Sequence, residues 1–297
     1  MYLPIGTVPA WLGVLGWLAA AASLAAALVR LRRSSVSLWT FAGAAALVAA
    51  LRLLEFPLHA EALFGGTVAA VGLVVIVFGV EVGVCCLAAA TLSLGLVAPH
   101  VDWAALGANL LAHVAVAPWL VWWLYSRLKA VFASEAGGYV LAFAVGGAGA
   151  PVVALTYLAM SPACGPVTAA VAWRILGAGL ALAAAEGVLA AWGYTLALSR
   201  RYRGDGRLER WTPRSWRGGF WMAVTAVILA AGAAPWIPPY GSALGPMPAL
   251  ARAAGVSFFL RAALGLATVG VAAALACLLF GAHKLIGLFF GNKKAGA

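Results

Sequence analysis

The chain has 297 residues, of which 65% are hydrophobic and only 9% are charged, and it contains 13 tryptophans. A soluble core cannot use this much apolar surface, so the composition excludes a soluble globular protein and predicts an all-α, polytopic membrane bundle. The formal net charge of +11 would suit nucleic acid if it formed a surface patch, but most of the basic residues lie between apolar runs, which predicts cytoplasmic loops instead.

The chain opens with an uncharged segment, Met1 to Trp11, that contains Pro4, Gly6 and Pro9. It lacks the basic n-region and the small-residue cleavage site of a signal peptide, so we expect it to stay on the mature protein. Proline and glycine this close together disfavour a regular helix. A non-helical backbone is tolerated near a bilayer only where protein or a water-lined cavity covers it. This N-terminal plug is therefore a candidate wall of a binding site.

Nine apolar runs are then long enough to cross about 30 Å of hydrocarbon. They cover residues 11–29, 38–54, 63–79, 81–98, 105–126, 138–160, 166–198, 219–235 and 257–281. The third and fourth meet at Gly79-Val80-Glu81, which predicts a tight helical hairpin or one broken element. The seventh is too long for one upright helix, so we expect residues 167–174 to form a tilted or interfacial first part.

Lysine and arginine predict the orientation, because they remain on the cytoplasmic side during insertion. Fifteen of the 19 basic residues follow the first, fifth, seventh and ninth runs. They are Arg30, Arg32, Arg33, Arg127, Lys129, Arg200, Arg201, Arg203, Arg207, Arg210, Arg214, Arg217, Lys284, Lys293 and Lys294. We therefore expect a multi-pass protein of the cell membrane with its N-terminus outside, its C-terminus inside and residues 201–218 as a basic cytoplasmic loop. The remaining arginines, Arg52, Arg174, Arg252 and Arg261, fall near the outer side.

Two predicted outer loops hold an unusual share of the scarce polar residues. These are Glu55, His59 and Glu61 in residues 54–61, and His100 and Asp102 in residues 99–103. Imidazole and carboxylate groups suit a divalent transition metal, and the Met1 amine adds a further nitrogen. The alternative is that they are ordinary solvated loop residues, and spacing alone favours it, because no histidine pair has the four-residue spacing of a helical metal site.

Inside the predicted helices each polar residue is costly unless it has a partner. Asn109 and His113 lie four residues apart and so share a helix face, where they either line a polar path or link helices by hydrogen bonds. Glu186 we expect to be structural, paired with Arg174 or with a helix end. Small residues around Gly107 and at 146–150 predict close helix approach. The cysteines, Cys85, Cys86, Cys164 and Cys277, show no metal or redox spacing and are interpreted as small buried residues.

Five segments of the chain resemble those of one family, in the right order. They are Met1-Tyr2-Leu3-Pro4-Ile5-Gly6-Thr7-Val8-Pro9, Phe56-Pro57, Leu63-Phe64-Gly65-Gly66, Ala105-Leu106-Gly107-Ala108-Asn109 and Glu186-Gly187. Residues 1 to about 200 are thereby similar to the CbiM/NikM membrane components of cobalt and nickel energy-coupling-factor transporters. The resemblance implies a seven-helix domain that captures Co2+ or Ni2+ as transported substrate, and partners that are a scaffold membrane protein and a pair of cytosolic ATPases.

The C-terminal part of the chain carries fewer motifs that resemble a known family. Residues 219–297, two runs flanking an outer loop of 236–256, resemble the two-helix CbiN/NikN accessory subunit in topology alone, because the Pro-Asp-Gly signature of that subunit is missing. A Gly-rich phosphate loop is also missing, so we expect the chain not to be an enzyme and not to hydrolyse ATP alone.

The resemblance fails at the metal ligands. The family holds its metal with the N-terminal amine and amide, a histidine at position two and a histidine just before the Gly-Gly of the third span. This sequence has Tyr2 and Ala62 there, and neither side chain replaces imidazole in a square-planar nitrogen site. One hypothesis is a relocated site. It would use the Met1 amine, His59 and His100 with Glu61 or Asp102, beside a polar path of Tyr2, Asn109, His113 and Glu186.

Two other functions remain open. The lost histidines favour a non-transporting membrane subunit, derived from the family, that anchors a larger complex; the retained plug and loop histidines weigh against it. A haem or quinone anchor would use His113, but an axial pair needs a second histidine at matched depth. His59, His100 and His283 all fall near membrane edges. Enzymatic chemistry is disfavoured because no nucleophile, base and orienting group recur at a useful spacing.

Overall fold

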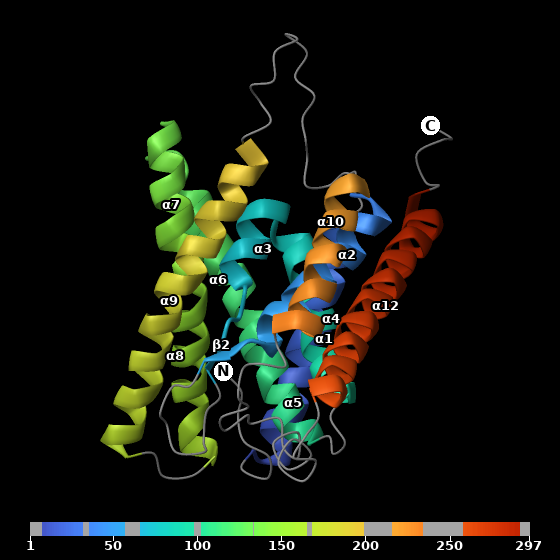
Figure 1. Ribbon diagram of the computed structural model, residues 1–297. Helices are drawn as coiled ribbons and strands as arrows, with labels where there is room; N and C mark the ends of the chain where they lie inside the picture. The colour runs from blue at the N-terminus through green and yellow to red at the C-terminus, as the bar shows by residue number, and fades with distance from the viewer. Residues whose placement is uncertain are drawn as a thin grey trace.

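The computed structural model describes residues 8–31, 36–56, 66–97, 102–132, 134–164, 168–198, 216–233 and 258–291. These residues form a bundle of helices that run along one common direction, with a two-stranded pair near mid-height (Figure 1). The helices are α1 (Ala10–Leu31), α2 (Leu38–Leu53), α3 (Val71–Phe78), α4 (Val80–Val97), α5 (Trp103–Leu110), α6 (Ala117–Leu128), α7 (Glu135–Gly147), α8 (Gly149–Cys164), α9 (Ala169–Leu198), α10 (Trp216–Ile228) and α12 (Phe258–Gly291). Short π-helical turns, η1 (Leu111–Val116) and η2 (Leu229–Ala233), follow α5 and α10, and the strands are β1 (Glu55–Phe56) and β2 (Gly66–Thr67).

In the described chain, six helical stretches are long and apolar enough to cross a membrane. They are Ala10–Leu31, Val80–Val97, Trp103–Leu128, Ala136–Cys164, Ile175–Thr195 and Ala262–Ile286. Shorter apolar helices occupy Leu38–Leu53 and Arg217–Gly232. The predicted all-α, multi-pass bundle is confirmed.

The third predicted run is shorter in the structure than in the prediction. It was expected to be apolar helix over residues 63–79, but residues 66–67 are strand, 68–70 are irregular, and α3 has only 8 residues, or about 12 Å of helix. The predicted break after it is confirmed. Gly79 adopts φ 91°, which a residue with a Cβ rarely adopts, and Gly83 of α4 packs against Val75 of α3, as a hairpin requires.

The seventh predicted run is one element. Ala169 begins an uninterrupted 30-residue helix, α9, which is about 45 Å long. The candidate membrane-crossing stretch of this helix begins only at Ile175, so the tilted or interfacial first part predicted for residues 167–174 stays a prediction. A helix longer than the hydrocarbon layer fits by tilting, and α9 slants across the bundle in Figure 1.

Small residues bring α1 and α5 into backbone contact. A Cβ added to Gly16 would collide with the carbonyl of Gly107, and one added to Gly107 would collide with the carbonyl of Gly13. Such contacts are a common basis of helix association in membranes. The predicted close approach around Gly107 is confirmed.

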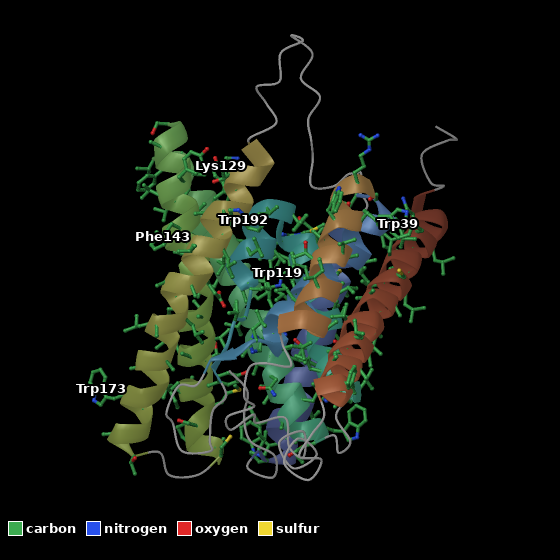
Figure 2. The ribbon with its side chains drawn as sticks, viewed as in Figure 1. Trp39, Trp119, Lys129, Phe143, Trp173 and Trp192 are labelled. Atoms are coloured by element: carbon green, nitrogen blue, oxygen red, sulfur yellow. The ribbon has the colours of Figure 1, made fainter. Side chains whose placement is uncertain are left out.

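Basic residues gather at one end of the bundle. Arg30 ends α1 and lies 4.9 Å from the ring of Trp119 on α6, while Arg127 and Lys129 end α6 and Arg217 begins α10. Figure 2 labels Lys129 and Trp39 near this upper end. By the positive-inside rule this end is cytoplasmic, so α3 lies in the cytoplasmic half and β1 and β2 lie deeper in the bundle (Figure 1).

Candidate functional site

An arginine lies inside the apolar bundle. Arg52, in the last turn of α2, is only 1% exposed. Its Nε and Nη2 both donate to the carbonyl of Ala69 at 3.3 Å, and its Nη1 donates to the Thr91 hydroxyl of α4. Charge counting assigned Arg52 to the outer side, and the structure adds that it is a buried helix residue and not part of a solvated loop. Charge counting assigns a side but does not reveal an arginine whose donors are satisfied internally.

A glutamate holds the same segment from the opposite direction. Glu186 of α9 is 1% exposed, and its Oε1 accepts hydrogen bonds from the backbone amides of Ala69 at 2.6 Å and Ala70 at 3.1 Å. These amides open α3, where the helix dipole favours a negative charge. Of the two partners predicted for Glu186, the helix end is confirmed, and the side chain of Arg174 lies outside the described residues.

Together these contacts form a clamp on the backbone, which we call the Arg52–Glu186 clamp. The peptide group of Ala69 is held at its amide by the carboxylate and at its carbonyl by the guanidinium. Ala70 adopts φ 56°, a left-handed conformation that costs about 1–2 kcal/mol for a residue with a Cβ. The surrounding contacts therefore enforce an unfavourable backbone geometry at the start of α3.

The clamp lies directly after the segment that carries the predicted ligands. Strands β1 and β2 pair antiparallel, with Glu55 opposite Thr67 and Phe56 opposite Gly66. The residues between them, 57–65, contain His59, Glu61 and Ala62 and lie outside the described part of the chain. The pairing and the clamp fix both ends of that stretch inside the bundle.

One oxygen of the clamp is unused. Glu186 Oε2 is buried and has no hydrogen-bond partner among the described residues. It faces Gly149 of α8, where an added Cβ would lie 2.8 Å from it. A buried polar atom without a partner is rare in native structures and requires an explanation. The same Cβ would also lie 3.0 Å from Val71 and 3.3 Å from Gly72, so Oε2 is packed closely against the start of α3 and the glycine of α8.

The described residues neither assemble nor exclude the predicted metal site. Asp102 caps the N-terminus of α5, since its Oδ1 accepts from the amides of Ala104 and Ala105 at 2.9 and 3.1 Å. The other predicted ligands and the path residue nearest to them lie outside the described residues. They are Met1, His59, Glu61 and His100, and Tyr2. Among the residues that the structure describes, no group of three His, Cys, Asp or Glu side chains gathers to hold a metal. The relocated site therefore stays a prediction.

A second, uncharged polar cluster lies between α5 and α8. Asn109 and His113 are both buried and both meet Tyr157 of α8. The Tyr157 hydroxyl lies 2.7 Å from Asn109 Oδ1, to which it donates, and its ring packs edge-on against the His113 ring at 6.1 Å. Of the two predicted roles for this pair, these contacts support the link between helices.

The π-helical turn η1 makes a related link. Its Val114 carbonyl accepts from the hydroxyl of Ser23 on α1 at 2.9 Å, and Ser23 accepts from the indole of Trp119 at 2.7 Å. A π-turn departs from the regular α-helical hydrogen-bond pattern and is often found at functional sites. Nothing in the periodicity of this apolar sequence predicts such a turn.

Sequence reasoning missed Arg52, Ala69, Thr91 and Tyr157. A usable signal existed for the arginine, because a charge within an apolar run is costly unless it is paired. The cysteine interpretation is confirmed for Cys85 and Cys86, which are buried, whereas Cys164 and Cys277 are half-buried.

The fold and site define a multi-pass helical membrane protein with two ionisable side chains buried inside its bundle, where such residues often mark functional sites. The chain belongs to the CbiM family, since the family model described as the cobalt uptake substrate-specific transmembrane region matches residues 2–205. Members of this family are components of a transporter, and the family is not an enzyme family.

A solved structure shows the same fold. It is described as the crystal structure of a transition metal transporter, is 20% identical in sequence, and aligns with a TM-score of 0.51 over 68% of this chain and 95% of its own. No protein among curated sequences matches this chain.

Proposed function

We propose that this protein is the substrate-capture component of an energy-coupling-factor type uptake transporter for a divalent transition metal, Co2+ or Ni2+. The family match supports cobalt uptake in general terms. The observation that carries the proposal is the Arg52–Glu186 clamp, because it holds the irregular segment next to the stretch where the family places a metal ligand. An anchor that had lost its function would not need a strained backbone at this point.

The ligand set of this chain differs from that of its relatives. With Tyr2 and Ala62 in place of two imidazoles, the metal would be held near the outer face by the Met1 amine, His59 and His100, with Glu61 or Asp102. A mixed set of nitrogen and oxygen ligands still suits a divalent transition metal.

Transport also requires an energy source that this chain does not carry. A scaffold membrane protein and a pair of cytosolic ATPases would provide it, with residues 201–218 facing them or the anionic lipid at the inner surface. Residues 219–297 would act as the fused accessory subunit. In the described part, α10 packs on α2, and α12 packs on α2 and α4, so this extension contacts the helix that presents Arg52.

The test is elemental analysis by mass spectrometry of purified protein with an untagged N-terminus. The wild type is expected to hold about one cobalt or nickel per chain, and the His59→Ala/His100→Ala double variant to hold none. A His283→Ala variant, which removes an imidazole from α12, is the matched control and keeps its metal. A metal-free wild type that copurifies with other membrane subunits would contradict the proposal and favour an anchor.

A further inference from the structure

An apolar groove opens in the cytoplasmic half of the bundle, away from the clamp. It has a volume of about 170 Å3 and is walled by α2, α3, α9 and α10. Its lining includes Leu73 and Val77 of α3, Gly193 of α9 and Met222 of α10, and its single polar side chain, Thr225, already donates to the carbonyl of Trp221. Such a surface offers nothing to a polar solute and matches a hydrocarbon chain.

The groove runs along one helix face from the cytoplasmic end inward. On α10 the lining residues are Gly218, Trp221, Met222 and Thr225, which share a face at helical spacing. They cover about 10 Å along the axis. The opposite wall includes Trp192, near the cytoplasmic end of α9 and in the upper half of the bundle in Figure 2. The groove, which we call the slot, therefore extends along α10 from the first turn of that helix at the cytoplasmic end.

The mouth of the slot is basic and aromatic. Arg217 is exposed and immediately precedes the lining residue Gly218. Trp192 is 56% and Trp221 62% exposed, and tryptophan favours the level of the lipid headgroups. Positive charge and indole at the mouth of an apolar slot complement an anionic phospholipid.

We propose that this groove is a binding site for an anionic glycerophospholipid, with one acyl chain against α3 and the phosphate beside Arg217. We favour a lipid over a helix of another protein because a lipid phosphate would pair with Arg217, whereas the apolar face of a helix would not. The lipid would complete the packing of α3, the half-length helix that begins at the clamp. The inference is independent of which metal, if any, the protein carries.

The test is native mass spectrometry of the full-length protein in detergent, titrated with phosphatidylglycerol and separately with phosphatidylcholine. Wild type is expected to retain phosphatidylglycerol in preference. Thr225→Trp fills the groove and is expected to weaken phosphatidylglycerol binding about tenfold, since at least two methylene groups lose their burial. Val227→Trp, at an exposed α10 position outside the groove, is the control and is expected to bind as wild type.

If the Thr225→Trp variant does not fold, a variant that removes a positive charge still tests the proposal. Arg217→Gln is expected to reduce the preference for phosphatidylglycerol about fivefold, the worth of one basic contact with an anionic lipid, whereas Lys284→Gln on α12 leaves it unchanged. Equal binding of both lipids by every variant would overturn the proposal. So would a Thr225→Trp variant that binds lipid normally but fails to join the scaffold subunit, because a protein helix would then be the occupant.

Discussion

Two polar clusters lie inside this apolar bundle, and they are built differently. The Arg52–Glu186 clamp uses two ionisable side chains, and most of their hydrogen bonds go to the backbone of Ala69 and Ala70. The cluster around Tyr157 joins α5 and η1 to α8 through a Tyr–Asn hydrogen bond between two uncharged side chains and a ring contact with His113. A neutral hydrogen bond is enough to link two helices. In the clamp, ionisable side chains satisfy the polar groups of an irregular buried backbone.

This difference in how the two clusters are built indicates that they have different roles. Double-mutant measurements put a hydrogen bond between membrane helices at about 0.6 kcal/mol, so the Tyr157 cluster adjusts stability. The clamp leaves Glu186 Oε2 unpartnered in the described structure and enforces a left-handed Ala70, which is unfavourable for folding. Natural proteins keep such features where function requires them.

The largest expected effect follows from breaking the clamp. Arg52→Leu removes the guanidinium that balances the buried Glu186 carboxyl and leaves the Ala69 carbonyl without its donors, so we expect a loss of about 3–5 kcal/mol. The thermal melting temperature in detergent, with size-exclusion chromatography, measures it. A variant with the melting temperature of the wild type would show that Arg52 does not stabilise the fold.

A smaller effect, of opposite sign, is expected at Ala70. Ala70→Gly removes the Cβ that disfavours the left-handed conformation, so we expect a gain of about 1 kcal/mol in stability. Ala69→Gly, one residue earlier, is the matched control and should not stabilise. The melting temperatures of the two variants are compared directly, and a destabilised Ala70→Gly would mean that the backbone strain described here is absent.

The smallest effect is expected in the neutral cluster. Tyr157→Phe keeps the ring contact with His113 and removes only the bond to Asn109, for an expected loss of about 0.6–1.5 kcal/mol. Unfolding in mixed micelles with increasing denaturing detergent measures this. A loss as large as that of Arg52→Leu would erase the distinction between the two clusters.

Particular residues show how far the sequence alone reaches. Gly79 marked the break between α3 and α4, and Gly107 marked the close approach of α1 and α5, because both depend on local chemistry. The left-handed Ala70 and the buried position of Arg52 were not predictable in this way. Both depend on partners more than 15 residues away in sequence, which no local pattern encodes. The candidate ligands other than Asp102 lie in stretches outside the described residues.

The most direct test of the account compares cobalt binding by wild type, Glu186→Gln and Tyr157→Phe, using equilibrium dialysis with radioactive Co2+ on folded protein. Glutamine retains an acceptor for the Ala69 and Ala70 amides but carries no charge. We predict that Glu186→Gln binds at least about tenfold more weakly, a difference of about 1.4 kcal/mol, while Tyr157→Phe binds as wild type does. Equal cobalt binding by wild type and Glu186→Gln would contradict the claim that the clamp serves metal capture.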